Sequence, residues 1–194
     1  MTMKVTLDIF SELVRHVLFS QRTDFSEFSS QEIIFYHAYT FMLEVSNGGL
    51  HQFLFNHSGE HTKETISSLN DAGLDEASKI LIKAIKLFPS EDVPIETSAR
   101  RELLEDININ QLRELDDIFY KVSDEFDSKL LDYVQQNMLE IVLSITLQSA
   151  ISKADVEFAN KDFKAVVDIL EPYKHILPAT KSTKFKMAIK KNAT

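Results

Sequence analysis

The scarcity of chain-breaking residues constrains the fold of this sequence more than any other feature. Only four glycines and four prolines interrupt its 194 residues, which leaves long stretches without the residues that stop helices or form hairpin turns. Within these stretches apolar residues recur every three or four positions, and no segment alternates convincingly with period two. The sequence therefore predicts an all-α fold.

The long helix predicted after Ser29 has clear start and stop signals. Ser29 and Glu32 form a capping-box pattern before a long apolar run. The helix is expected to continue to about Ser46 and to stop at Asn47-Gly48-Gly49, with Gly48 in the left-handed conformation that glycine adopts readily. Further helices are predicted at about 6–19, 63–72, 74–88, 99–106, 111–126, 128–136, 139–158 and 163–170.

A short apolar helix is expected immediately after the glycine pair, from Leu50 to Asn56, ending at Ser58-Gly59. Its consecutive Phe53, Leu54 and Phe55 cannot all face water, so the segment is predicted to be buried between its neighbours.

Two segments of different charge are predicted, an acidic all-α core at 1–138 and a helical hairpin with a basic tail at 139–194. Between Asp24 and Ile145 there are 23 acidic and 9 basic residues, a net charge of −14, whereas the whole chain has −9. The stretch FANKDFKAVVDILEPY in the hairpin resembles half of a tetratricopeptide helix pair. An acidic body is not the footprint of a nucleic-acid binder.

The chain contains no cysteine, which excludes disulfides, thiol nucleophiles and cysteine-ligated zinc and suits a reducing cytosol. Its N-terminus lacks the apolar core and cleavage site of a signal peptide, and no apolar run approaches the ~18 residues that span a bilayer. We expect a soluble cytoplasmic protein.

His57 and His61 belong to an H-x-x-E-H pattern, which is the inverted zinc-protease motif. That chemistry needs both imidazoles on one face of a continuous helix. Because Ser58-Gly59 lies between the histidines at an expected helix end, we favour solvated histidines in a turn and expect no metal.

Three amides accompany the glycines, at Asn47, Gln52 and Asn56. They can cap helix ends and connect the short helix to the long one, which is the interpretation we favour. Alternatively they line a small polar pocket.

The pattern formed by these residues resembles that of a family of bacterial all-α proteins named after a DNA mimic. The resemblance runs from about residue 32 to residue 133, and it implies a domain of unknown function with a DNA-mimic-like or toxin-immunity role. The residues that carry it are Asn47, Gly48, Gly49, Gln52, Asn56 and Gly59.

Acidic residues crowd the predicted helix around residue 120, where Leu112, Leu115, Ile118, Phe119 and Val122 are expected to form the buried stripe. The carboxylates should then project into solvent, either as an ordinary solvated face or as a surface that imitates DNA phosphates. The candidate partner-binding residues are Glu114, Asp116, Asp117, Asp124, Glu125 and Asp127.

Five lysines near the end of the chain are interpreted as a solubilising tail rather than a nucleic-acid arm, because only Phe185 among them could stack on a base. They are Lys181, Lys184, Lys186, Lys190 and Lys191.

No phosphate-binding glycine loop, nucleophile elbow or nucleotide fingerprint occurs in the sequence. We therefore expect a non-enzymatic protein without a cofactor that acts, as a monomer or homodimer, on a basic protein such as a DNA-binding regulator or a toxin. Direct binding to nucleic acid or membrane is not expected. Two alternatives stay open: a small-molecule or enzymatic pocket under the Asn47–Asn56 motif, and a helical scaffold that binds a peptide.

Overall fold

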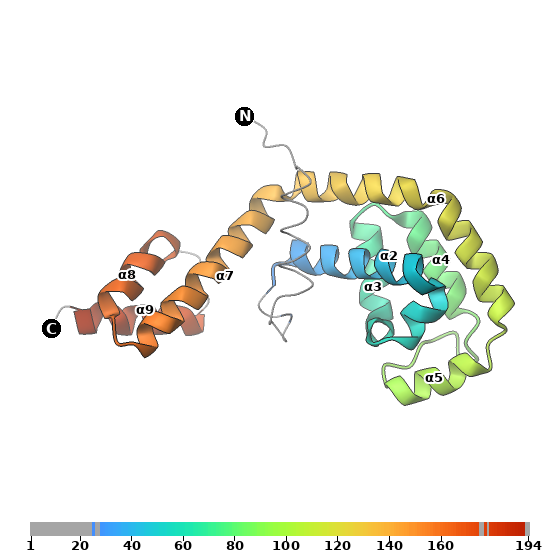
Figure 1. Cartoon of the computed structure of the whole chain (residues 1–194), viewed down its shortest axis with the longest axis horizontal. Helices are drawn as coiled ribbons and strands as arrows, with labels where there is room; N and C mark the ends of the chain where they lie inside the picture. Colours follow the sequence, from blue (N-terminus) through green and yellow to red (C-terminus); the bar gives the residue numbers. More distant parts are fainter. Residues whose placement is uncertain (1–24, 26–27, 175–176, 178, 193–194) are drawn as a thin grey trace. The chain divides into compact units, whose positions relative to one another are not determined.

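The computed structural model describes residues 25, 28–174, 177 and 179–192. This part of the chain forms eight α-helices and two short 3-10 helices and contains no strand, which confirms the predicted all-α fold (Figure 1). The chain divides into two compact units, Met1–Met138 and Leu139–Thr194. The helix predicted at 6–19 lies outside the described residues.

Helix α2 (Ser30–Phe55) begins with the predicted capping box. The Glu32 N–H donates to Ser29 Oγ at 3.2 Å, and the Ser29 N–H donates to Glu32 Oε2 at 2.9 Å. The helical conformation is interrupted at Gly48 (φ −151°) and Gly49 (φ +74°) and then resumes. The predicted interruption is therefore confirmed, but the left-handed residue is Gly49 and not Gly48.

Four further helices complete the first unit: α3 (Thr62–Asp71), α4 (Asp75–Ile85), α5 (Thr97–Glu105) and α6 (Ile109–Gln136). Helix α2 contacts α3, α5 and α6, while α4 contacts α3 and α6. Figure 1 shows α6 curving around the outside of α2, α3 and α4. The prediction of two helices at 111–126 and 128–136 is wrong, because Asp127 and Ser128 interrupt neither the backbone hydrogen bonding nor the apolar pattern of α6.

Aromatic residues from α2 and α6 form the centre of this core. Phe41 packs edge-on against Phe53 and Phe119, with ring centroids 5.1 and 5.9 Å apart, and Phe119 contacts Phe126 at 5.2 Å. All four rings are buried. Such rings contribute both apolar burial and ring–ring attraction.

The buried stripe of α6 differs from the predicted one. Its fully packed members recur along the whole helix at helical spacing: Leu112, Phe119, Phe126, Leu130, Tyr133 and Val134. Ile118 is 41% exposed, so its assignment to the buried stripe is wrong. Ile118 and Phe119 are adjacent, and a helix turns by about 100° between neighbours, so both cannot point into one core.

The second unit contains α7 (Met138–Ala159) from its second residue onward, α8 (Phe163–Leu170) and α9 (Ala179–Asn192). Asp162 caps α8 by accepting a hydrogen bond from the Ala165 N–H at 2.9 Å. The three helices share a core, whose fully buried members are Ala150, Ile151, Ala154, Val166, Leu170, Phe185 and Ala188. The lysine-rich segment is therefore a packed third helix and not a tail beside a hairpin.

Within the part of the chain that the structure describes, no helix combines the length and apolar character needed to cross a bilayer.

Candidate functional site

The polar side chains around the glycine break converge on the carboxylate of Glu44. Gln52 Nε2 donates to Glu44 Oε2 at 2.5 Å, and Asn56 Nδ2 donates to the same oxygen at 2.9 Å. Ser58 Oγ lies 3.5 Å from Glu44 Oε1, and Asn47 Nδ2 donates to Gln52 Oε1 at 3.3 Å. We call these five residues the Glu44 network.

The Glu44 network joins the two helical parts of α2. Glu44 precedes the break at residues 48–49, whereas Gln52 and Asn56 follow it, so their hydrogen bonds fix how the chain continues after the break. The structural role of the amides stays a prediction, which these contacts support. Sequence reasoning missed Glu44, because a single carboxylate on a helix is typical of a solvated face.

Both glycines at the break have close neighbours. A Cβ on Gly48 would collide with the side chain of Gln52, and a Cβ on Gly49 would collide with the carboxylate of Asp116. Gly49 also has a positive φ, which side chains other than glycine rarely adopt. The pair therefore permits both the turn and the close approach of α6.

Asp116 holds the segment after the break. The Leu50 N–H donates to Asp116 Oδ1 at 2.8 Å, and this N–H lies at the start of the resumed helix, where no intrahelical acceptor is available. Burial raises the pKa of Asp116, and the Leu50 hydrogen bond opposes this effect. The prediction that Asp116 projects freely into solvent for a partner is wrong, because its carboxylate faces α2.

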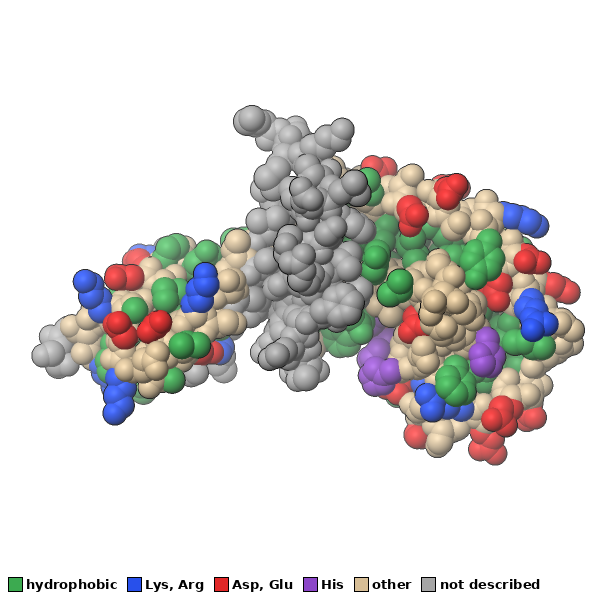
Figure 2. Space-filling view, viewed as in Figure 1, with side chains coloured by type: hydrophobic (Ala, Val, Ile, Leu, Met, Phe, Trp, Pro, Cys, Tyr) green, Lys and Arg blue, Asp and Glu red, His purple; other side chains and the backbone are tan. Residues whose placement is uncertain are grey.

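The other predicted acids of α6 are exposed. We call them the acidic face; they are Glu114, Asp117, Asp124, Glu125 and Asp127. Glu125 forms an ion pair with Lys129 at 2.9 Å. Figure 2 shows acidic side chains spread over the visible side of the first unit, with few basic ones between them.

A buried arginine closes the end of α2. Arg100 is fully buried, and its Nε and Nη2 donate to the carbonyls of Leu54 at 2.7 Å and Asn56 at 2.9 Å. Nη1 donates to two carbonyls of the preceding loop, at Pro94 and Ile95. The guanidinium thereby satisfies helix-end carbonyls that have no intrahelical partner.

Gly59 is required by this arrangement. A Cβ at Gly59 would lie 2.7 Å from the Leu54 carbonyl oxygen and 2.8 Å from Arg100 Nε. The short helix predicted at Leu50–Asn56 ends at Phe55, one residue before its expected end, and Ser58-Gly59 lies in the 3-10 helix that follows. Phe55 is 38% exposed beneath the guanidinium of Arg101, 4.1 Å from its ring centroid. Its predicted full burial is therefore wrong, unlike that of Phe53 and Leu54.

Glu60 lies close to Arg100, with its Oε1 3.8 Å from Nη2. Thr97 Oγ1 donates to the same oxygen at 2.5 Å. The Thr97 hydrogen bond is the main cause of a lowered pKa at Glu60, with a smaller contribution from His57. Burial lowers the pKa of Arg100. These residues connect α5 to the 3-10 helix η2 (His57–His61).

The two histidines of the H-x-x-E-H pattern lie at the ends of η2 and not on a continuous α-helix. The His57 side chain is 78% exposed and its Nδ1 lies 2.9 Å from Glu60 Oε2. His61 is half-buried, so the prediction of a solvated residue is right for His57 and wrong for His61. In the described ranges, no three His, Asp or Glu side chains are placed so that they could hold a metal ion.

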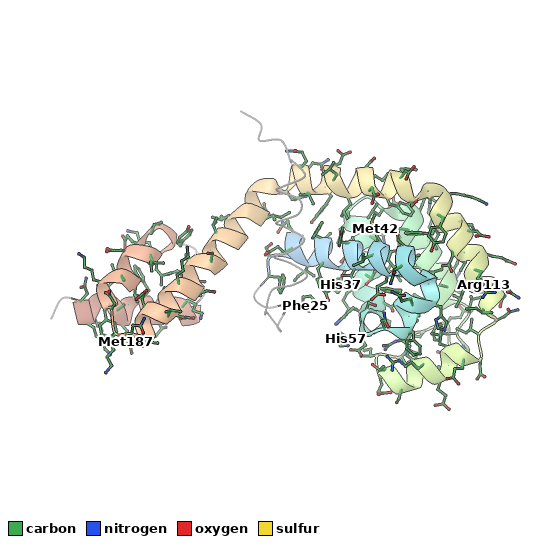
Figure 3. All side chains as sticks on the ribbon, in the orientation of Figure 1. Phe25, His37, Met42, His57, Arg113 and Met187 are labelled. Carbon is green, nitrogen blue, oxygen red and sulfur yellow. The ribbon has the colours of Figure 1, made fainter. Side chains whose placement is uncertain are left out.

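His61 packs into an aromatic cluster that the sequence did not indicate. The His37 ring lies 5.4 Å from the His61 ring, 5.3 Å from Phe25 and 5.3 Å from Tyr36. Figure 3 shows Phe25 beside His37 at the start of α2. Burial lowers the pKa of His37 to about 4, aided by the nearby charge of His61 and opposed by Glu64.

The lysines of α9 do not act as one surface. Lys181 forms an ion pair with Asp155 at 2.6 Å, and the Lys191 ammonium lies 4.8 Å from the Phe163 ring centroid. Lys186 and Lys190 are exposed. Part of the basic charge therefore stabilises the second unit.

These features define an all-α protein in which a glycine-broken helix is held by a carboxylate-centred network and a buried arginine. The family of DMP19-like proteins matches residues 26–137, more than half of the sequence, and the chain belongs to this family. The match covers the stretch from residue 32 to residue 133 that carries the sequence resemblance. No curated protein and no solved structure matches the chain.

Proposed function

We propose that this protein is a non-enzymatic binding protein whose acidic face occupies a basic surface of a partner protein. The observation that carries the proposal is a set of four exposed carboxylates on α6. No described residue forms an ion pair or hydrogen bond with these side chains, which belong to Glu114, Asp117, Asp124 and Asp127.

The geometry of α6 supports this role. Glu114 and Asp127 are 13 residues apart, a rise of about 20 Å along a helix. Phe119 and Phe126 point into the core, whereas the four carboxylates are exposed, so they form a broad charged ridge on the solvent side of α6. A negative ridge within a segment of net charge −14 would attract a basic protein and repel DNA itself.

The partner class follows from this chemistry. A basic surface of comparable length occurs where a DNA-binding regulator or a nucleic-acid-cleaving toxin contacts phosphates. The DNA-mimic character that gave the resembling family its name agrees with such a partner. The protein would act by blocking that surface.

The Glu44 network favours a structural role over a catalytic one for the Asn47–Asn56 motif. Gln52 and Asn56 donate to Glu44 rather than to an open space, so their amides hold the scaffold that supports α6. We propose that the protein needs neither metal nor cofactor for this role.

A salt series tests the proposal. Partners captured from a lysate of the source organism at low salt would be identified, purified and measured against wild type and a variant carrying Asp117→Asn, Asp124→Asn and Asp127→Asn. We expect a several-fold lower association rate for the variant and a shallower salt dependence.

A matched variant carrying Asp71→Asn, Glu102→Gln and Glu105→Gln changes the net charge equally at exposed positions away from α6. It should retain most of the affinity. Equal losses of affinity in both variants would show that binding depends only on net charge and not on the acidic face. Unchanged affinity in the α6 variant would overturn the proposal.

A further inference from the structure

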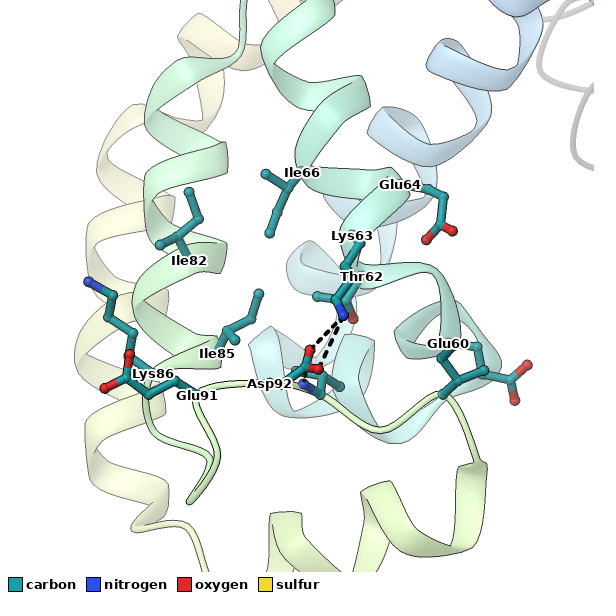
Figure 4. Close-up of a pocket in the computed structure, with 12 residues that line it drawn as sticks. Glu60, Thr62, Lys63, Glu64, Ile66, Ile82, Ile85, Lys86, Glu91 and Asp92 are labelled. Carbon is teal, nitrogen blue, oxygen red and sulfur yellow. Dashed lines mark hydrogen bonds and ion pairs between the residues drawn. The ribbon is translucent and has the colours of Figure 1, made fainter.

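A pocket of about 270 Å³ lies between α3, α4 and the loop that follows α4 (Figure 4). Its apolar lining consists of Ile66, Ile82, Ile85, Val93 and Ile95. Figure 4 shows Ile66 of α3 facing Ile82 and Ile85 of α4. None of the lining residues belongs to α6, so the pocket is separate from the acidic face.

The walls of the pocket are fixed by buried anchors and hydrogen bonds. Phe88 and Val93 hold the loop to the core, being 2% and 7% exposed. Arg100 Nη1 donates to the loop carbonyl of Ile95 at 2.7 Å. Lys63 Nζ lies 3.1 Å from both carboxylate oxygens of Asp92, which joins α3 to the loop. A cavity held in this way is present before a ligand arrives.

The lining contains branched aliphatic side chains but no aromatic ring. It therefore offers no stacking surface for a nucleobase or another flat ring. Its volume is just below the range typical of drug-sized ligands. A short, flexible aliphatic chain fits such a floor best, because it gains apolar contact at every carbon.

Charged side chains around the pocket mouth, which we call the rim, determine which polar group the aliphatic ligand should carry. Four carboxylates and two ammonium groups surround the pocket: Glu60, Glu64, Glu91, Asp92, Lys63 and Lys86. Lys63 and Asp92 neutralise each other, and Glu60 is held by Thr97 and His57. Glu64, Glu91 and Lys86 form no ion pair with any described residue. Because the unpaired acids outnumber the unpaired lysine, the rim keeps a negative charge that favours a cation at the mouth.

We propose that this pocket binds a short primary aliphatic amine, with the alkyl chain among the isoleucines and the ammonium group at the carboxylates of the rim. The proposal does not depend on the acidic face, since either site can be altered while the other is kept.

The test uses the ¹⁵N-labelled full chain and three probes of equal length: n-pentylammonium, pentan-1-ol and pentanoate. At constant ionic strength we expect saturable shifts of amides lining the pocket with the amine. Its affinity should be about threefold higher than that of the alcohol, as expected for a surface charge pair. Pentanoate should cause no saturable shift.

Three variants locate the effect. Ile82→Arg places a positive side chain in the pocket from a position that is 37% exposed and should abolish saturable amine binding. Ile118→Arg, at a similarly exposed isoleucine of α6 (41%), should leave it unchanged. The double variant Glu64→Gln/Glu91→Gln should lower the affinity for the amine to about that for the alcohol. If Ile82→Arg does not fold, this double variant tests the proposal in its place.

The proposal is overturned if the amine gives no saturable shifts, or if pentanoate binds as well as the amine. Retained amine binding in Ile82→Arg, with its fold confirmed by circular dichroism, would equally overturn it.

Discussion

Asp116, in the first third of α6, accepts a hydrogen bond from the backbone N–H of Leu50 at 2.8 Å, across 66 positions of the sequence. One carboxylate therefore caps the helical segment after the glycine break and fixes α6 against α2. The residue had the same sequence signature as its acidic neighbours, yet it belongs to the scaffold and they belong to the surface.

Replacing Asp116 by Ala should lower the free energy of unfolding by about 1–2 kcal/mol, because the Leu50 N–H loses its acceptor as at a deleted helix cap. Urea denaturation of the full chain measures this loss. Asp117→Ala is the control, since Asp117 is exposed, and it should change stability by no more than about 0.5 kcal/mol. Equal effects at the two positions would contradict the assignment.

The Glu44 network should behave as a coupled unit. Glu44→Ala removes the acceptor of Gln52 and Asn56 and should cost about 1–3 kcal/mol of stability. A double-mutant cycle between Glu44→Ala and Gln52→Ala should give a coupling energy of about 1 kcal/mol. If Gln52→Ala and Asn56→Ala keep full stability and instead abolish partner binding, the network is a binding site rather than a scaffold.

Two glycines allow backbone strain to be separated from crowding. Gly49 and Gly73 have almost the same φ, +74° and +73°, but a Cβ on Gly73 would meet nothing within 4 Å. Gly73→Ala should cost about 1 kcal/mol from the left-handed conformation alone. Gly49→Ala should cost clearly more in the same denaturation assay, since its Cβ also displaces Asp116. Equal losses of stability in the two variants would show that α6 moves away from the added Cβ at little energetic cost.

The sequence predicted most elements of this structure because their signals are local. Apolar period, the Ser29–Glu32 capping box and the glycine pair each act within a few residues, and each is found where it was expected. The contacts of Asp116 and Arg100 could not be predicted in this way. Their partners lie 66 and 46 positions away along the chain, so only the packing of α2 against α5 and α6 brings them together.

Arg100 should be the least replaceable charged residue of the first unit. Arg100→Lys keeps the charge but loses the planar guanidinium that donates to carbonyls on three sides. We therefore expect the free energy of unfolding to fall by about 3 kcal/mol or more. Arg101→Lys is the neighbouring control, because Arg101 makes one carbonyl hydrogen bond, to Phe55, and is partly exposed. Its cost should stay below about 1 kcal/mol in the same thermal or urea unfolding experiment. A similar cost for both variants would mean that the Leu54 and Asn56 carbonyls find other donors.

Acidification should destabilise the first unit through His37. The folded-state pKa is lowered to about 4 by burial among Phe25, Tyr36 and His61, whereas the unfolded chain has an ordinary pKa of about 6.5. Above pH 7 both states are neutral and His37 contributes no pH dependence. Between about pH 6.5 and pH 4 only the unfolded state gains this proton, so stability falls as pH falls. The loss reaches about 3 kcal/mol and then levels off.

A comparison of variants isolates this contribution from that of the carboxylates. His37→Phe keeps a ring in the aromatic cluster but cannot take a proton, so its stability should fall less than that of wild type between pH 7 and pH 4.5. Denaturant unfolding at half-unit pH intervals measures both proteins. Parallel curves for wild type and His37→Phe would show that His37 titrates normally in the folded protein, and that the packing of Phe25 and His61 does not hold it neutral.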